Sequence, residues 1–167
     1  HTRWSGDWSS DVCSSDLGTK IMVDDDKFVD VKDLKVGDYV KTYKHGLKKI
    51  KFVYNKNHLN SRGLLQQIRK LDNGVYLTGG HSVLLDNIPD GVPEKYRDLG
   101  KIDDKQLCLS VYAENSIMIE NNDLYKVYHI VLENEDIYGR YGVFAGDNIE
   151  NIVLCESLSY DWYNKYK

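Results

Sequence analysis

The stretch Leu64–Leu85 reads LLQQIRKLDNGVYLTGGHSVLL, and its turn residues predict β-structure. Asn73-Gly74 lies between two apolar runs, which is the strongest short-range signal for a hairpin. The residue types of 64–71 favour a helix when taken alone, but the turn that follows favours a pair of strands over 64–71 and 75–78. Gly79-Gly80-His81 then breaks the chain sharply before another strand resumes.

The rest of the chain repeats this pattern of short apolar or alternating segments closed by turn residues. Asn55–Gly63 is polar and is expected to be a loop. Residues 86–104 hold both prolines and are expected to form a long surface excursion with a short helical turn. The sequence therefore predicts an all-β fold, with further strands at 20–23, 39–43, 50–54, 82–85, 107–112, 117–120, 124–132, 141–145 and 152–154.

The size and charge of the chain exclude several classes of function. It has 167 residues with 22 basic and 26 acidic side chains, which gives a formal net charge of −4. This length suits one domain, and a small acidic excess gives no electrostatic reason to expect nucleic acid as a partner. No apolar run approaches the roughly 20 residues that a membrane-spanning helix needs. We expect a monomer that binds neither nucleic acid nor membrane.

The cysteines, histidines and acidic runs give no pattern typical of a metal or cofactor site. Three cysteines cannot form a complete disulfide framework. Cys108 and Cys155 occupy apolar strand positions and are expected to be buried structural thiols, which fits a reducing cytoplasm. The Cys and His spacings do not match a zinc site, and Asp24–Asp26 fits a solvated turn better than a calcium loop. We therefore expect no metal and no cofactor.

The first 17 residues, HTRWSGDWSSDVCSSDL, lack the apolar core of a signal peptide and show no apolar periodicity. They resemble the conceptual translation of a sequencing adapter. We therefore expect residues 1–17 to be a non-native, disordered segment and the natural gene to be cut at its 5′ end. The expected organisation is a domain over 18–159 followed by a tail, 160–167, that can form a short terminal helix.

The sequence Thr78-Gly79-Gly80-His81 is the most unusual local motif. Two glycines let the backbone turn sharply, which can bring a hydroxyl, two backbone N–H groups and an imidazole around one point. Such groups serve as oxyanion donors and proton donors in acyl transfer. The alternative is an ordinary β-turn in which the imidazole bonds to the backbone.

Three blocks of the chain together resemble the Hint fold shared by hedgehog autoprocessing domains and inteins. The first block is Gly18–Val40, with its Gly-Thr start and its Val-Lys-Asp-Leu-Lys-Val-Gly-Asp-Tyr-Val segment. Thr78-x-x-His81 falls where those proteins have a T-x-x-H block. The terminal block is matched by Tyr128–Asn134, Tyr141–Ala145 and Val153–Ser157. The resemblance covers Gly18 to about Ser159 and implies a horseshoe of short, mostly antiparallel strands and hairpins.

The resemblance also implies a reaction. A Hint domain begins with a cysteine, sometimes a serine, a few residues before the Gly-Thr pair, and the cysteine thiol attacks the carbonyl just upstream to form a thioester. By this resemblance His81 donates a proton to the leaving amine, and Thr78 orients the scissile carbonyl or hydrogen-bonds to it. The partner is the protein's own upstream polypeptide in cis. The activity is autocatalytic, without multiple turnover, and water, a thiol, a sterol or an extein residue resolves the thioester.

Three departures from the family pattern lead us to expect that the chain as given is inactive. Cys13 lies five residues before Gly18, about one position too far, and is not assigned as the nucleophile. Tyr54 and Asn55 stand where hedgehog-type domains have an aspartate. Splicing inteins end in His-Asn before Cys, Ser or Thr, and this pattern is absent, so splicing is not expected, whereas N-terminal cleavage or transfer stays open for the uncut gene.

Two alternatives remain open at this point. One is a non-catalytic module of the same fold, and the other is an unrelated all-β binding module in which Thr78–His81 is purely structural. The Hint interpretation requires the start of the strand 18–23 to lie close to Thr78 and His81.

Overall fold

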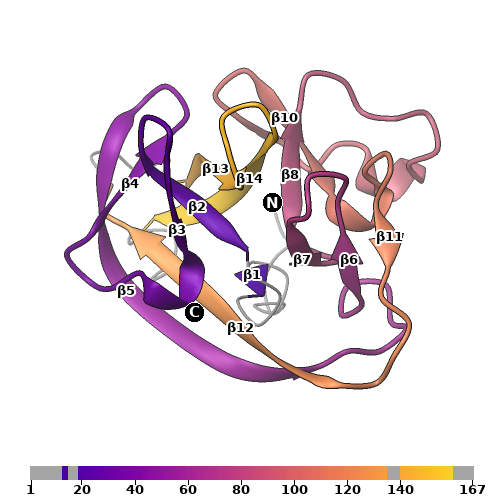
Figure 1. Cartoon of the computed structure of the whole chain (residues 1–167). Helices are drawn as coiled ribbons and strands as arrows, with labels where there is room; N and C mark the ends of the chain where they lie inside the picture. The colour runs from indigo at the N-terminus through magenta and orange to yellow at the C-terminus, as the bar shows by residue number, and fades with distance from the viewer. Residues whose placement is uncertain (1–12, 15–18, 135–139, 160–167) are drawn as a thin grey trace.

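The computed structural model describes residues 13–14, 19–134 and 140–159, which form one highly curved sheet (Figure 1). The predicted all-β architecture is confirmed. Short 3₁₀ turns are present at η2 (Val31–Asp33), η3 (Glu94–Tyr96) and η4 (Ser110–Tyr112). The strands are β1 (Cys13–Ser14), β2 (Lys20–Asp24), β3 (Lys27–Asp30), β4 (Tyr39–Thr42), β5 (Gly46–Leu59), β6 (Ile68–Lys70), β7 (Tyr76–Thr78), β8 (Ser82–Leu85), β9 (Lys101–Ile102), β10 (Lys105–Leu109), β11 (Ile117–Met118), β12 (Leu124–Leu132), β13 (Arg140–Gly146) and β14 (Ile152–Ser159).

A long ribbon made of β5 and β12 forms the base of the horseshoe (Figure 1). The two strands pair antiparallel from Leu59–Leu124 to Ile50–Leu132. The expected loop over Asn55–Gly63 is therefore wrong for 55–59, which continue β5. Their polar composition hid the strand, whereas pairing with β12 satisfies their backbone groups.

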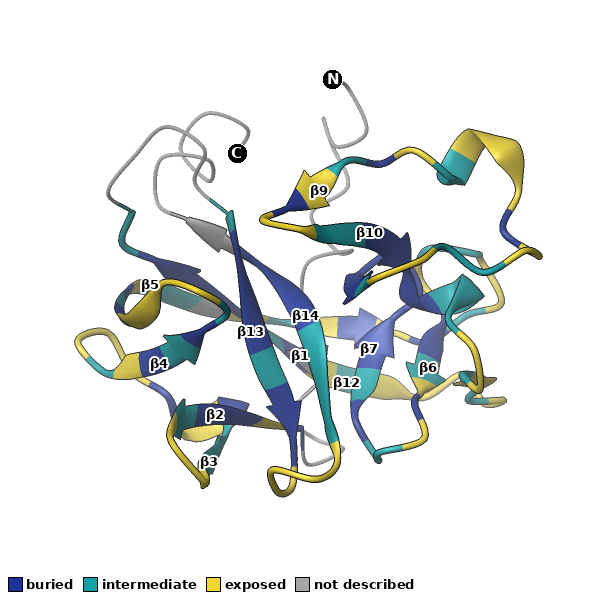
Figure 2. Cartoon of the chain, turned by 90° about the horizontal axis from the view of Figure 1, so that it is seen from above, coloured by how far each residue is buried: buried dark blue, intermediate teal, exposed yellow. Residues whose placement is uncertain are grey.

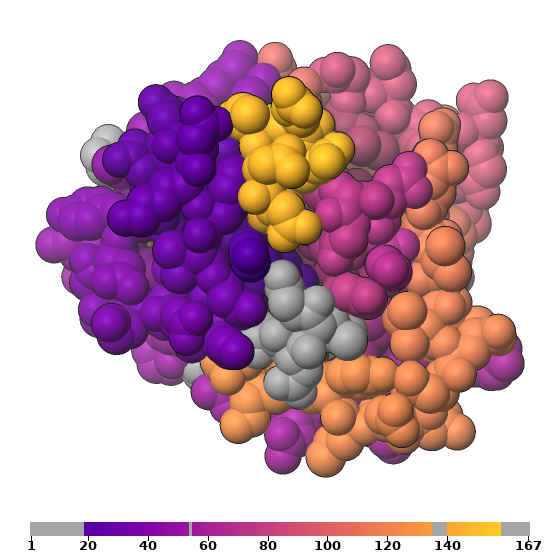
Figure 3. Space-filling view, viewed as in Figure 1, coloured from indigo at the N-terminus to yellow at the C-terminus, as the bar shows by residue number. Residues whose placement is uncertain are grey.

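The two arms of the horseshoe meet over a shared core. β2, β3 and β4 form one arm, β6–β11 form the other, and the β13–β14 hairpin lies between them (Figures 1 and 3). β14 contacts the second arm through the Cys155–Val83 pair. Figure 2 shows that buried residues follow the inner strands. The main core includes Ile21, Val40, Ile50, Val83, Val143 and Cys155, and a smaller cluster in the second arm contains Leu84, Leu99, Ile102, Leu107 and Leu109.

The hairpin predicted around Asn73-Gly74 is confirmed as β6–β7, with Gly74 at φ +84°. The first half of the predicted strand 64–71 is wrong, because residues 64–67 form turns. The N–H groups of Gln66 and Gln67 both donate to the carbonyl of Gly63. The helical propensity of this segment thus prevails locally, and the strand begins only at residue 68.

The excursion predicted over 86–104 is present, with η3 as its short helical turn and β9 near its end. Within the segment expected to be disordered, Cys13 and Ser14 form the two-residue strand β1 between β7 and β12. The remainder of that segment and the tail 160–167 lie outside the described residues. No helix of the described part is long and apolar enough to cross a membrane.

Candidate functional site

The turn that joins β7 to β8 holds Thr78 and His81 in the interior. Their residues are only 1% and 2% exposed. The N–H of His81 donates to the carbonyl of Thr78 (2.9 Å), which closes the turn. Ser110, at the start of η4, spans it from outside: its Oγ donates to the Thr78 carbonyl (2.8 Å) and its N–H donates to the His81 carbonyl (2.9 Å).

The two glycines of the turn serve packing rather than anion binding. The N–H of Gly79 donates to the Gln67 carbonyl (2.7 Å), and the N–H of Gly80 donates to the Leu65 carbonyl (3.1 Å). The expectation that these N–H groups point at a shared reaction centre is therefore wrong, because both are committed to the 64–67 turn. A Cβ at residue 79 would lie 2.2 Å from the Leu64 carbonyl oxygen, so only glycine permits this close approach.

Thr19, directly before β2, is hydrogen-bonded to Tyr76 at the start of β7, and Ile21 of β2 lines the same cavity as His81. Thr19 is 1% exposed, and its Oγ1 both donates to the Tyr76 carbonyl (3.3 Å) and accepts from the Tyr76 N–H (3.2 Å). Its own carbonyl accepts from the N–H of Val31 (3.0 Å). Tyr76 lies two residues before Thr78, so the chain enters the domain alongside the turn that carries Thr78 and His81.

The same neighbourhood contains the two described residues that precede Thr19. In the register of β1, Cys13 stands opposite both Leu77 of β7 and Tyr128 of β12, and Ser14 stands opposite Val127. The backbone at position 13 is thus next to the residue that precedes Thr78.

His81 lines a small internal cavity of about 20 Å³, which we call the histidine cavity. Thr78 is close in sequence but does not line this cavity. The structure therefore places Thr78 and His81 in the same turn but not around the same cavity. The other lining residues come from five segments of the chain: Ile21, Val31, Tyr128, Ile130, Val143, Glu156 and Ser157.

Two charged residues of this cavity region were not singled out from the sequence. Glu156 is 1% exposed, and its Oε2 accepts from Nη1 of Arg140 at 2.6 Å. These residues lie on the paired strands β14 and β13. Taking charges out of water is costly unless they are paired, so this ion pair fixes a negative group next to His81. A glutamate within an apolar strand is the one sequence signal that could have indicated it.

His129 is the second imidazole of the site. The structure buries it almost completely, with 1% exposed. Burial lowers the pKa of His129 to about 3, and electrostatic interactions with His81 and Lys56 act in the same direction while the interaction with Glu156 opposes them. His129 is therefore neutral at ordinary pH and lies within electrostatic reach of His81.

These groups can transfer protons but are not arranged as a metal site. His81 and Glu156 line the histidine cavity, Arg140 pairs with Glu156, and His129 interacts electrostatically with both His81 and Glu156. Within the described ranges no group of three or more His, Cys, Asp or Glu could hold a metal ion. Cys108 and Cys155 are buried, and burial raises the pKa of Cys108 to about 11, so these thiols are placed as structural residues.

Comparison with known proteins supports the fold. No protein-family model matches the sequence, and no curated protein sequence matches it. Among solved structures, the fold is similar to the solution structure of a bacterial intein-like domain from Clostridium thermocellum, with a TM-score of 0.51 and 17% identity. The match covers 88% of this chain and 99% of that one. The chain therefore has a Hint-like fold.

Proposed function

We propose that this domain is a Hint-type autoprocessing domain that breaks the peptide bond directly before a nucleophile four residues upstream of Gly18 through an N-to-S acyl shift. The observation that carries the proposal is the anchoring of Thr19 by both bonds of its hydroxyl to Tyr76, two residues before Thr78. A polypeptide that enters the domain through Thr19 runs beside the buried turn that holds Thr78 and His81. The likeness to an intein-like domain supports the same assignment.

The proposed step conserves atoms and charge. A cysteine sulfur forms a bond to the upstream carbonyl carbon, and the C–N bond of that peptide breaks. The thiol loses one proton and the leaving amine gains one. An imidazole that accepts the first proton and donates the second leaves the buried site neutral overall, and this is the role of His81. Thr78 hydrogen-bonds to the scissile peptide and orients its carbonyl.

His129 and the Arg140–Glu156 pair act through His81 in this proposal. A neutral imidazole adds no charge to the interior, so His129 is a positioning residue rather than an acid. The Glu156 carboxylate favours a transient positive charge on nearby imidazoles, which eases the moment at which His81 holds the proton. Its ion pair with Arg140 moderates this effect and holds the carboxylate in place.

The chain is its own substrate and reacts once, without a cofactor. We also propose that residues 1–17 do not contain the natural nucleophile, so that the chain as given is inactive. The missing residue corresponds to position 14, four residues before Gly18, rather than to Cys13. Successive strand residues alternate between faces, so a shift of one position is not conservative.

The test moves the cysteine by one position. A reporter protein is fused upstream of His1, and the double variant Cys13→Ser, Ser14→Cys is compared with the unchanged chain under hydroxylamine. We expect the double variant to release the reporter with a hydroxamate at residue 13, detected by mass spectrometry. The unchanged chain should stay intact, because its cysteine is one residue away from the proposed position.

His81→Ala in the double-variant background should slow release at least about 100-fold, since it removes the proton carrier. His45→Ala is the matched control, because His45 is exposed, pairs with Asp103 at 2.8 Å and does not line the histidine cavity. A double variant with native near-UV circular dichroism and no release would overturn the proposal. That result would favour the non-catalytic module.

A further inference from the structure

A second hollow lies on the far side of the contact between β8 and β14. These strands are in register at one pair, Val83–Cys155, and diverge on both sides of it. In one direction lies the histidine cavity with His81 and Glu156. In the other direction the strands open onto a groove of about 390 Å³, which lies within the usual size range of small-molecule pockets.

The floor of this groove is apolar. Leu71 and Val83 are buried at its base, and Leu85 and Val153 lie half-buried on the two diverging strands. Ala113 and Pro89 belong to the opposite wall. A ligand that fills the groove would remove this surface from water, which is the main source of affinity in such pockets.

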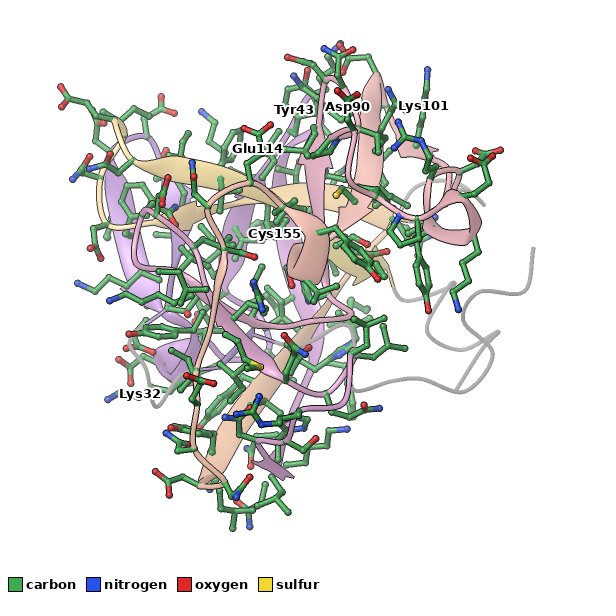
Figure 4. The ribbon with its side chains drawn as sticks, turned by 90° about the vertical axis from the view of Figure 1, so that its right-hand side faces the viewer. Lys32, Tyr43, Asp90, Lys101, Glu114 and Cys155 are labelled. Atoms are coloured by element: carbon green, nitrogen blue, oxygen red, sulfur yellow. The ribbon has the colours of Figure 1, made fainter. Side chains whose placement is uncertain are left out.

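The rim carries only negative charge. Asp72, Asp86 and Glu114 line it, whereas no lysine or arginine does. Asp86 pairs with Lys105 at 2.5 Å. Among the described residues, neither Asp72 nor Glu114 forms an ion pair, so two exposed carboxylates remain available beside an apolar floor. Glu114 is labelled in Figure 4.

The walls are held in place without a ligand. Nδ2 of Asn73 donates to the carbonyls of Ala145 (3.2 Å) and Asn151 (3.1 Å), which ties the β6–β7 turn to the β13–β14 hairpin. Nη1 of Arg97 donates to the carbonyls of Pro89 (2.9 Å) and Val92 (3.2 Å), which fixes the opposite loop. A groove formed in advance spares a ligand the entropy cost of ordering it.

We propose that this groove, the acidic-rimmed groove, is a binding site for a small organic cation with an apolar body, such as an alkylamine. The apolar part lies against Leu71, Val83 and Val153, and the cationic group lies between the carboxylates of Asp72 and Glu114. The proposal stands on the groove alone and does not depend on the acyl shift.

The test follows amide chemical shifts of the full chain on titration with n-hexylammonium, hexanol and hexanoate. We expect saturable shifts centred on residues 71–73, 83–87, 113–114 and 152–153 with hexylammonium, and at least fivefold weaker binding of hexanol and hexanoate. The double variant Asp72→Asn, Glu114→Gln should weaken hexylammonium binding about fivefold, since exposed charge pairs contribute modestly. Both side chains are exposed, so the variant should fold normally.

The matched control is Glu120→Gln, which removes an exposed carboxylate that pairs with Arg62 outside the groove and should leave binding unchanged. Equal binding of all three probes, or an unchanged affinity in the double variant, would overturn the proposal. A short lysine-containing peptide is titrated in parallel. Saturable binding of that peptide without binding of hexylammonium would also overturn it, in favour of a peptide site.

Discussion

The histidine cavity and the acidic-rimmed groove lie on opposite sides of one residue pair, Val83–Cys155, yet their carboxylates differ in burial and in ion pairing. In the cavity, Glu156 is buried and paired with Arg140. In the groove, Asp72 and Glu114 are exposed and form no ion pair within the described part of the chain. The difference teaches that a buried carboxylate needs a partner within the fold, whereas the exposed carboxylates of the groove do not, and the proposed ligand would use them.

The largest effect should come from breaking the buried ion pair. Arg140→Met removes the guanidinium from a carboxylate that is 1% exposed, and we expect the free energy of unfolding to fall by about 3–5 kcal/mol. Urea unfolding measures it. Arg62→Met is the control, because Arg62 pairs with Glu120 in the open, and it should cost less than about 1 kcal/mol. Similar losses in the two variants would contradict the contrast.

The second largest loss of stability is expected for a substitution at Gly79, in the Thr78–His81 turn. Gly79→Ala forces a methyl group to within 2.2 Å of the Leu64 carbonyl oxygen, and we expect a loss of about 3 kcal/mol in the free energy of unfolding. Gly91→Ala places its Cβ in open space near the groove and should change stability by no more than about 0.5 kcal/mol. Thermal denaturation of both variants makes the comparison, and a harmless Gly79→Ala would refute the close packing.

The pH dependence of stability tests His129. Because burial lowers the pKa of His129 to about 3 from 6.5, the unfolded chain binds more protons than the folded one between these values. The free energy of unfolding therefore falls as the pH drops from 6.5 toward 3. From pH 7 to pH 5 we expect His129 alone to contribute a loss of about 2 kcal/mol.

His129→Gln should flatten this slope when urea unfolding is measured at several pH values. His45→Gln, at an exposed position, should leave most of the slope in place. An equal slope in the wild-type chain and the His129→Gln variant would mean that the imidazole is not held neutral in the interior.

The smallest change in stability is expected for a substitution at the rim of the acidic-rimmed groove. Asp72→Asn removes one of the carboxylates that line the groove, and we expect a change of less than about 0.5 kcal/mol in either direction, since the side chain is exposed. Thermal denaturation at low salt checks this. A clear loss of stability would show that the rim carboxylates already serve a structural role, unlike a site kept for a ligand.

Local signals were sufficient for most strands but not for the site. Asn73-Gly74 correctly indicated the β6–β7 hairpin, because a two-residue turn is encoded by its own residues. The strand over 55–59 was missed because only its partner β12, far along the chain, makes it a strand. The glycine N–H groups were misassigned for a similar reason: their acceptors, at Leu65 and Gln67, depend on how the 64–67 segment packs.

The residues around His81 illustrate the same limit. Thr78 and His81 could be singled out because four adjacent residues carry the motif. Arg140 and Glu156 come together only when β13 pairs with β14, and His129 reaches them along a third strand. No spacing within the sequence indicates that these three residues come together. The burial of Glu156 in the folded sheet does indicate it, because a buried carboxylate needs a partner.

The ribbon of β5 and β12 also determines when the domain can finish folding during its synthesis. Ile50 pairs with Leu132, so the base of the horseshoe cannot close until the ribosome has released most of the domain. Arg140 and Glu156 follow later still. In the proposed reaction, a nascent chain therefore keeps its upstream bond intact throughout synthesis. Cleavage begins only when the domain has completed its folding.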